Sequence, residues 1–418
     1  MRRVGAYIRG LNPELPRSVQ ILQVGGLLNA LGNGLVLPFL FIYLHEVRDM
    51  SPAVSGLIVG TNRAVSIVAG PAYGALIDRI GPRRTLTIAL GLMACGFASY
   101  PLVHEPWQGF LAAAVAGLGN GGFWPSQSTL VAGLTPPERM HAAFAMQRIV
   151  MNLGIGLGVV IGGLIASTSA AGSFTLLFLA DASTFVIFGL VLRLVPDRGQ
   201  PREREQPAGG FGTLLRHRPF MLVIALNVAF VTAGIAQFEI WPGYMTSEAG
   251  VSERGVAIVF AVNTVLIVLA QLPVSQWLEG RRRMPAMLGV GLTWGAAWLS
   301  VPLVGASADG VLAAGLFCIA GMVFAVGECL HGAVQGPLVV DLSDERLLGR
   351  YMAVSALSWS VGFAAGPAIG GFLLGVSPPL LWLAAGSVCV LAGLASVAIE
   401  PLLPRSVRRT AGGRMAEA

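Results

Sequence analysis

The sequence predicts an all-α membrane protein whose twelve transmembrane helices form two pseudo-symmetric six-helix bundles. The first supporting observation is composition: 55% of the 418 residues are hydrophobic and only 11% are charged, whereas soluble domains carry about a quarter charged residues. The second is the recurrence of apolar runs such as 54–77 and 111–134, each long enough to cross a bilayer, which takes about 20 residues. The third is an internal repeat that relates the two halves of the chain.

The apolar runs divide the chain into twelve predicted spans with short connections between them. The spans cover residues 18–44, 52–77, 85–104, 107–134, 141–167, 173–194, 220–247, 254–278, 285–305, 310–340, 351–375 and 379–400. The longest connection, 195–219, is polar and rich in proline, glycine and arginine, so it is expected to be a cytoplasmic linker. The predicted organisation is an N-terminal bundle (1–194), this linker, a C-terminal bundle (220–400) and a cytoplasmic tail (401–418).

The arginines predict the orientation of the chain, because all 27 basic residues are arginine. With both termini in the cytoplasm, 23 arginines fall in cytoplasmic segments, Arg48 and Arg254 in outer loops, and Arg63 and Arg148 within spans. Such an excess follows the positive-inside rule, and it accounts for the net charge of +6 without a nucleic-acid partner. We therefore expect a multi-pass protein of the bacterial inner (cell) membrane; arginine-only usage is typical of a GC-rich bacterial genome.

An internal repeat relates the two halves. The similar segments are QSTLVAGLTPPERM (127–140) with QGPLVVDLSDERLL (335–348), and GIGLGVVIGG (154–163) with GFAAGPAIGG (362–371). An offset of 208 places Asn120 and Gln127 opposite Glu328 and Gln335. Two parallel six-helix halves with a binding site between them are typical of a secondary transporter.

The segment GALIDRIGPRRTL (74–86) concentrates one acid and three arginines between two apolar runs. It resembles the loop between the second and third helices of the major facilitator superfamily, which reads Gly-x-Leu-x-Asp-Arg-x-Gly-x-Arg-Arg. The matching residues are Gly74, Leu76, Asp78, Arg79, Gly81, Arg83 and Arg84, with Pro82 at a position where the family usually has arginine. The resemblance extends along the whole chain and implies the major facilitator fold.

The physical chemistry of this loop explains its composition. Asp78 falls at the end of a predicted helix, where the helix dipole disfavours an anion, so a neighbouring cation or helix N-terminus is expected to compensate it. Gly81 and Pro82 are expected to end one helix and begin the next. The resemblance implies that this cluster latches the two halves on the cytoplasmic side in the outward-open state. The alternative, that the arginines only set topology, leaves Asp78 unexplained.

A glycine pattern bears on the direction of transport. Exporters of the superfamily carry Gly-x-x-x-Gly-Pro-x-x-Gly-Gly in the fifth helix, and here the fifth span has Val159 in place of the proline. The glycines of that span are Gly154, Gly158, Gly162 and Gly163, and the complete pattern occurs in the eleventh span as Gly362, Gly366, Pro367, Gly370 and Gly371. Generic close packing of helices is the alternative explanation.

Three short segments resemble the proton-driven multidrug exporters of the superfamily: HEPW (104–107), GLGNGGFWPSQSTLV (117–131) and QFEIWPGY (237–244). Those antiporters usually carry an arginine in the fourth helix, four residues before a Gly-x-Gly. This chain has Ala113 at that place, so proton coupling through that arginine is not expected.

Ionisable groups inside spans are costly and suggest function. They are Arg63, Arg148, Asp181, Glu239 and Glu328. The resemblance implies that helices 1, 4, 7 and 10 line the cavity, which ranks Glu328 and Glu239 above Asp181, for which a structural role is favoured. We expect Glu328 or Glu239 to take up a proton, since loss of water around a carboxylate favours its neutral form. The alternative is a buried carboxylate paired with Arg63 or Arg148.

The predicted cavity combines amides with aromatic rings. Glu328, His331 and Gln335 share one helical face by their spacing, as do Asn120, Trp124 and Gln127. Alignment of two prolines places Asn33 opposite Gln237, and the expected aromatic walls are Trp124, Trp241 and Trp359. Few polar groups among apolar and aromatic walls suit a small amphiphilic organic substrate.

Other classes of function are disfavoured. GLGNGG (117–122) matches a nucleotide-binding pattern but lies inside a predicted span with no strand before it. No Walker loop or hydrolase motif occurs, and the four cysteines lie within apolar runs. We expect no cofactor and no enzyme activity, with the proton gradient as the energy source.

Three hypotheses stay open. The first is a proton-coupled exporter of small amphiphilic compounds, and the second is an uptake symporter or uniporter of the same superfamily. The third, a membrane-embedded enzyme or receptor, predicts a catalytic constellation or an appended domain, and neither is visible. The expected partners are a small-molecule substrate and the lipid bilayer, with the protein acting as a monomer.

Overall fold

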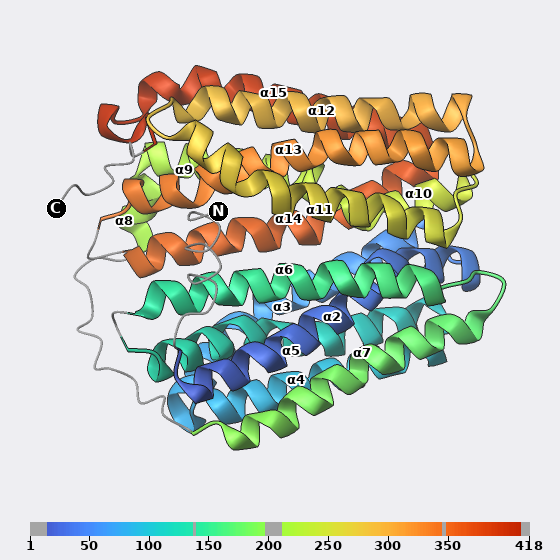
Figure 1. Cartoon of the computed structure of the whole chain (residues 1–418), viewed down its shortest axis with the longest axis horizontal. Helices are drawn as coiled ribbons and strands as arrows, with labels where there is room; N and C mark the ends of the chain where they lie inside the picture. The colour runs from blue at the N-terminus through green and yellow to red at the C-terminus, as the bar shows by residue number, and fades with distance from the viewer. Residues whose placement is uncertain (1–14, 137–138, 197–210, 345–347, 411–418) are drawn as a thin grey trace, which may run out of the picture. The chain divides into compact units, whose positions relative to one another are not determined.

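The protein is helical almost throughout, as Figure 1 shows for a computed structural model that describes residues 15–136, 139–196, 211–344 and 348–410. Within these residues the β-structure is limited to one isolated bridge between Arg282 and Arg409. The prediction of an all-α fold is therefore confirmed.

Each predicted span contains a helix. The first six spans correspond to α2 (Arg17–Ile42), α3 (Pro52–Ile80), α4 (Pro82–Ser99), α5 (Pro106–Leu134), α6 (Met140–Ile165) and α7 (Ala171–Val191). The others correspond to α9 (Arg218–Ala233) with α10 (Trp241–Ser247), α11 (Glu253–Leu278), α12 (Arg283–Ser307), α13 (Gly310–Leu342), α14 (Leu348–Val376) and α15 (Pro378–Ile399). In the described part of the chain, ten helical segments are long and apolar enough to cross a membrane; α5 and α6 carry the two remaining predicted spans.

The helices pack as two compact units. Unit 1 comprises Met1–Arg48 and Thr61–Glu203, and unit 2 comprises Asp49–Gly60 and Arg204–Ala418. The start of α3, up to Gly60, thus packs with unit 2, and the remainder packs with unit 1. The units describe which residues contact one another; the bundle boundaries at 194 and 220 stay a prediction.

In unit 1, α2 packs against α6 and α7, and α4 packs against α5 and α7. The α2–α6 contact is backbone to backbone, because a Cβ atom built on Gly158 would lie 2.8 Å from the Cα atom of Gly34 and against the carbonyl of Leu31. Gly154 and Gly162 lie equally close to α2. Small residues at such spacing allow the close helix contacts that stabilise membrane bundles.

Unit 2 repeats this arrangement. Here α9 packs against α14 and α15, α12 against α13 and α15, and α11 against α13. Gly362 and Gly366 bring α14 close to Thr232 of α9, while Gly371 brings it close to Gly56 at the start of α3. The glycines of both predicted exporter patterns therefore serve close helix packing, with Gly163 also buried.

The seventh predicted span differs from the expectation of one continuous helix. It is broken at Gly234 into α9, a 3₁₀ segment η5 (Ile235–Glu239) and α10. The break is compensated, because Nε2 of Gln237 donates hydrogen bonds to the carbonyls of Thr232, at 2.8 Å, and Gly366, at 3.1 Å. A side-chain donor is needed here, since backbone groups freed inside a membrane must be satisfied by the protein.

Aromatic side chains fill the interior of unit 2. Trp294 stacks on Phe324 with ring centroids 4.9 Å apart, and Trp298 lies 4.8 Å from the same ring. Trp241 is fully buried and packs edge-on against Trp298 at 5.2 Å. The side chain of Trp241 thus belongs to this core, whereas we expected it to wall a cavity.

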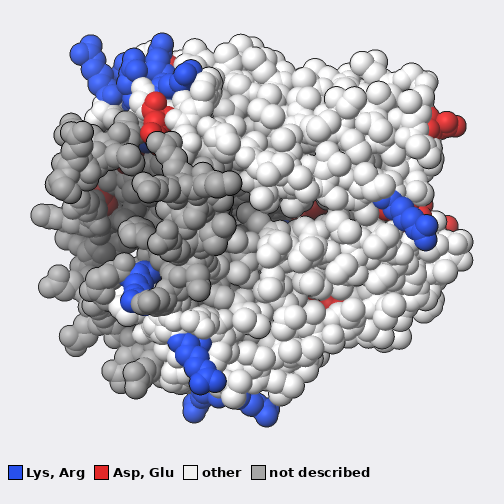
Figure 2. Space-filling model, in the orientation of Figure 1, with Lys and Arg blue, Asp and Glu red and all other residues white. Residues whose placement is uncertain are grey.

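Charged side chains gather at the ends of helices. Figure 2 shows broad uncharged areas along the helices and arginines near their ends, for instance where α12 begins and α15 ends. Many exposed side chains of the helices are large and apolar, such as Leu269 and Leu391. An apolar surface of this kind matches contact with lipid chains rather than water.

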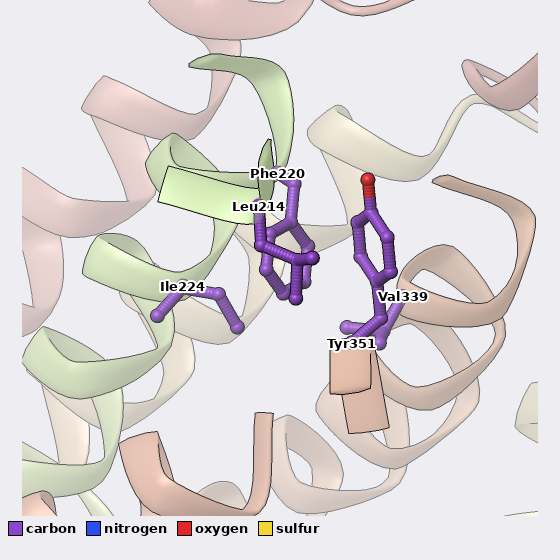
Figure 3. Close-up of a cluster of buried hydrophobic side chains, with 5 residues drawn as sticks. All are labelled: Leu214, Phe220, Ile224, Val339 and Tyr351. Carbon is purple, nitrogen blue, oxygen red and sulfur yellow. The ribbon is translucent and has the colours of Figure 1, made fainter. Parts of the chain in front are cut away.

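A small hydrophobic cluster anchors the start of the second half. Figure 3 shows its members, which are Leu214, Phe220, Ile224, Val339 and Tyr351. They join the short helix α8 (Phe211–Arg216) and α9 to α13 and α14. Beside the cluster, Nδ1 of His217 lies 2.9 Å from the hydroxyl of Tyr351, so a polar contact closes it at the membrane edge.

Acidification is expected to weaken the His217 contact. Burial lowers the pKa of His217 below its usual 6.5. A group whose pKa is lower in the folded state contributes stability above its unfolded pKa, and that stability is lost as the pH falls through the folded pKa. The melting temperature of the purified protein should therefore fall between pH 7 and pH 5, and fall less in His217→Gln. Exposed His104→Gln is the control; an equal pH dependence in all three proteins would contradict this expectation.

Close packing of α2 and α6 predicts a position-specific effect of added volume. Gly158→Leu should destabilise the protein by at least about 1–3 kcal/mol, the cost of forcing extra methylene groups into a packed interior. Gly189→Leu, on α7, is the matched control, because a Cβ atom there would meet nothing within 4 Å. Size-exclusion profiles and thermal melts distinguish the two variants, and equal behaviour would show that the α2–α6 contact is not close.

Candidate functional site

Glu328 of α13 lies beside Asn263 of α11 in unit 2. Nδ2 of Asn263 donates to Oε2 of Glu328 at 3.0 Å and to the carbonyl of Gly321 at 3.2 Å. Asn263 is buried, with 6% of its surface exposed. Of the described side chains, none forms an ion pair with Glu328. Glu328 is half-buried, and among the described groups a single neutral donor serves its carboxylate. A buried ionised group usually requires a charge partner or several donors.

Unit 1 contains the corresponding contact between α5 and α3. Nδ2 of Asn120 donates to Oδ1 of Asn62 at 3.0 Å. The repeat predicted that Asn120 and Glu328 correspond; the structure adds that each bonds to an asparagine, Asn62 or Asn263, on the helix two positions earlier in its half. Unit 2 therefore has a carboxylate where unit 1 has an amide.

Asn62 and Asn263 were not among the predicted site residues. The available signal was one amide in the second span, beside Arg63, and three amides in the eighth span, Asn263, Gln271 and Gln276. Since polar side chains within spans are rare, Asn62 and Asn263 deserved the same weight as Asn120. Their partners could not be named, because that required the packing of α3 on α5 and of α11 on α13.

His331 links three helices of unit 2. Its Nε2 lies 3.0 Å from Oδ1 of Asn227 on α9, and Nδ2 of Asn227 donates to Oγ of Ser358 on α14 at 2.7 Å. Because an amide oxygen only accepts, Nε2 of His331 carries the proton in this bond. The ring of His331 lies 5.4 Å from that of Trp294 and 5.5 Å from that of Trp359.

The expected shared face of α13 divides between different neighbours. Glu328 turns toward α11, and His331 toward α9 and α14. Gln335 is buried, and its Nε2 has no hydrogen-bond partner among the described atoms. Equal spacing on one helix did not bring these three side chains to one contact, because four helices, α9, α11, α12 and α14, surround α13.

Glu239 lies at the helix break of the seventh span. It is half-buried and ends η5, directly before α10. Discontinuous helices at mid-membrane form the ion and substrate sites of many secondary transporters. Gln237, two residues earlier, donates its side-chain hydrogen bonds to backbone carbonyls at the break. The amide nitrogen of Gln237 therefore stabilises the fold and is not free to bind a substrate.

The predicted cavity residues of unit 1 have different exposures. Gln127 is buried, Asn33 and Arg63 are half-buried, and Trp124 is 42% exposed with its ring edge-on to Phe123. The side chain of Arg148 lies outside the described residues. The cavity combines residues of both units, so its existence stays a prediction.

The loop 74–84 has the predicted backbone. Helix α3 ends at Ile80, Gly81 adopts a positive φ of 86°, and Pro82 begins α4. A glycine is required at this φ, since other residues rarely adopt it. The expected division of one helix from the next at Gly81–Pro82 is confirmed.

The charged groups of this loop are described only in part. Nη1 of Arg83 donates to the carbonyl of Val195 at 3.0 Å, within unit 1. Arg79 and Arg84 are exposed, and open space surrounds Gly74. The side chain of Asp78 lies outside the described residues, so the latch between the halves stays a prediction.

The segment LEGRRRM (278–284), before and at the start of α12, forms ion pairs within unit 2. Nε and Nη2 of Arg282 donate to the two carboxylate oxygens of Glu400, at 2.9 and 2.5 Å, and this pairing raises the pKa of Arg282. Arg283 is buried and donates to Asp341 at 2.5 Å and to the carbonyl of Val407 at 3.2 Å. The three consecutive arginines are visible in the sequence, but the groups that accept their hydrogen bonds are not, because these lie 58 to 124 residues away along the chain.

The glycine-rich segment 117–122 serves helix packing. It lies within α5, where Gly117 contacts Asn62, Gly121 contacts Ser66 and Gly122 contacts Tyr73 of α3. Each of these glycines leaves room for a neighbouring helix, which is the ordinary use of glycine in membrane bundles.

Comparison with protein families and with curated proteins gives matches over nearly the whole chain. The model of the Major Facilitator Superfamily matches residues 22–241 and 223–417. The multidrug resistance protein MdtH of Cronobacter sakazakii is 27% identical over 375 residues, 88% of this chain and 90% of that protein. MdtH of Klebsiella pneumoniae is 25% identical over 373 residues, with 88% and 90% covered.

Solved structures share the fold at low sequence identity. The nucleoside transporter NupG has a TM-score of 0.74 at 13% identity, covering 92% of this chain and 100% of that chain. A bacterial homologue of the human lysosomal transporter Spinster, solved in an inward-facing and occupied conformation, has a TM-score of 0.73 at 16% identity and covers 94% and 98%. At these identities the likeness concerns the fold alone.

Proposed function

Because the chain belongs to the Major Facilitator Superfamily, we propose that this secondary transporter exports small amphiphilic organic compounds in exchange for protons. The observation that carries the proposal is the contact of Glu328 with Asn263, a membrane carboxylate served by one amide. The chain is a multi-pass membrane protein that transports a small molecule; it is not an enzyme. The export direction, the proton and the residue assignments are the proposal.

The Glu328 contact has the properties that a proton carrier requires. Among the described groups Glu328 has one neutral donor and no cation partner, so its ionised form is only weakly stabilised and a change in its surroundings can shift it between the charged and neutral forms. Ionised, the group attracts a cationic substrate into a medium of low dielectric constant, where charge interactions are strong. Protonated, it loses that attraction and its burial costs less, so substrate and proton compete for one position.

The repeat supports the choice of Glu328. In unit 1 the corresponding position is Asn120, whose contact with Asn62 cannot change charge. Of these two corresponding contacts, only the one in unit 2 contains a group that can bind and release a proton. Glu239 is the second candidate, because it ends the 3₁₀ segment at the helix break.

Export is favoured by the relatives named as multidrug resistance proteins and by the glycine packing of α6 and α14. Uptake of a nutrient or metabolite is the second candidate, since the similar solved structures include transporters of nucleosides and peptides. Ala113 also favours it, because exporters usually carry an arginine there, and the buried Ala113 leaves α5 without that charge. We further propose a monomer in the bacterial inner membrane, with cytoplasmic termini and no cofactor.

The direction of transport is tested by accumulation of a fluorescent lipophilic cation in bacteria that lack their main efflux pumps. Expression of the protein should lower accumulation several-fold, and an uncoupler that dissipates the proton gradient should abolish the difference. Expression of Glu328→Gln at the same level is the control for indirect effects on the membrane potential. Accumulation that rises on expression would contradict export and support uptake.

Proton coupling through Glu328 predicts two matched effects in proteoliposomes. Glu328→Gln should lose at least about tenfold of the pH-driven transport rate, since the amide cannot carry a proton. Asn263→Ala should move the pH of half-maximal transport upward by about half to one unit, because one hydrogen bond contributes about 1 kcal/mol and one pH unit corresponds to about 1.4 kcal/mol.

Asn62→Ala is the matched control, because it removes the corresponding amide of unit 1. It should leave the pH of half-maximal transport unchanged. Full transport with an unaltered pH profile in Glu328→Gln would remove Glu328 from the coupling role and leave Glu239 as the candidate.

A further inference from the structure

Asp181 is the buried carboxyl group of unit 1. It lies in the middle of α7, its side chain has no exposed surface, and neither carboxyl oxygen has a hydrogen-bond partner among the described atoms. The other four aspartates with described side chains, Asp49, Asp309, Asp341 and Asp344, are exposed. Asp181 is therefore unlike every other described aspartate of the chain.

The carboxyl group of Asp181 lies directly against the backbone of α2. A Cβ atom built on Gly32 would collide with Oδ1 of Asp181 and would lie 2.5 Å from Oγ1 of Thr184. Seven residues away on both helices, Gly25 receives the ring of Phe188 in the same manner. The two contacts show that α2 and α7 run antiparallel with their backbones separated by little more than these side chains.

The one hydroxyl group at this contact is already used as a donor. Oγ1 of Thr184 donates to the backbone carbonyl of Asp181 at 2.7 Å. A hydroxyl group has one proton but two lone pairs, so Thr184 has nothing left to donate to a carboxylate. It does have a free acceptor position for the proton of a carboxylic acid. The surroundings therefore suit the neutral acid and not the anion.

Among the described side chains, no charged group compensates the carboxyl either. The titratable groups on the elements packed against α7 lie on six elements. They are Arg17 on α2, Tyr43, His45 and Glu46 on η1 (Tyr43–Val47), Arg83, Arg84 and Cys95 on α4, Tyr100 on η2 (Tyr100–Leu102), Arg193 on η4 (Leu192–Leu194), and His141 and Arg148 on α6, whose side chains lie outside the described residues. None of the described groups forms a hydrogen bond or ion pair with Asp181. An unpaired buried carboxylate costs several kcal/mol.

Packing alone does not require an acid at this place. The offset of the repeat, 208, makes Cys389 of α15 the counterpart of Asp181, and Cys389 is also fully buried. An uncharged side chain thus fills the corresponding position of unit 2. The acid of unit 1 adds chemistry that the fold does not need.

We propose that Asp181 is a proton-binding site of unit 1, which holds its proton as a neutral carboxylic acid while α2 and α7 are packed at Gly32. Release of the proton leaves a carboxylate that needs donors. One available donor is the amide of Asn29, which is buried, lies one turn before Gly32 on the same face of α2, and has an Nδ2 without a partner among the described atoms. Ionisation therefore requires α2 and α7 to move until Asn29 or water reaches the carboxylate.

The Asp181 site is a different site from Glu328. Whether Asp181 holds a proton does not depend on the proposed function. Only the release of that proton during transport rests on the proposed function. If the protein exchanges substrate for protons, Asp181 adds a second proton that is released when α2 and α7 separate. If the protein does not use protons, Asp181 is still protonated in the packed state.

Infrared spectroscopy of the purified protein in lipid bilayers tests the proposal. At pH 7, wild-type protein should show a carbonyl band of a protonated carboxyl group that shifts when aspartate carries ¹³C in its side-chain carboxyl. The band should be lost in Asp181→Asn and retained in the exposed control Asp309→Asn. It should also be retained in Glu328→Gln, because a glutamate band does not respond to labelled aspartate.

Two outcomes would overturn the proposal. One is a labelled wild-type protein without any label-sensitive band at pH 7, a result that requires no variant to fold. The other is a band that persists in Asp181→Asn. Thermal melts give an independent readout. Because the amide mimics the neutral acid, Asp181→Asn should have the same melting temperature as wild-type protein at pH 7. If Asp181 were instead ionised and structural, the melting temperature of the variant would be lower.

Discussion

Each unit of this protein depends on helices that approach one another backbone to backbone. Lipid chains are as apolar as leucine, so association within a bilayer relies on close packing and on hydrogen bonds between helices. Gly34 and Gly158 provide such an approach between α2 and α6, and Gly32 provides it between α2 and α7. The same close packing excludes water, so every polar group at these contacts must find a hydrogen-bond partner within the protein or remain without one.

Polar side chains follow from that constraint in two ways. Some complete the fold, as Gln237 does at the break of the seventh span and as Asn227 does between His331 and Ser358. Others are left with too few partners to hold a charge, as are Glu328 and Asp181. Within a secondary transporter, groups of the second kind are suited to carry protons, because small rearrangements of the helices change which protonation state is stable.

The sequence predicted the helices, the repeat and the turn at Gly81–Pro82, because these depend on local composition and spacing. It did not predict the break of the seventh span at Gly234, where the side chain of Gln237 donates to the freed carbonyl of Thr232. It placed Trp241 in a cavity wall, while the structure encloses that ring among other aromatic side chains. It also missed Asn263 and Glu400, whose importance comes from partners on other helices.

By itself the sequence determined that this is a multi-span helical membrane protein with two related halves, because hydropathy, arginine placement and the repeat act along the chain without reference to distant residues. Only the tertiary structure decided which polar groups meet. Asn263 contacts Glu328 across 65 residues and Arg283 contacts Asp341 across 58, whereas the carboxyl oxygens of Asp181 have no donor among the described atoms. A partner is a property of two helix surfaces brought together, and helix periodicity specifies which face a residue occupies but not which helix lies opposite.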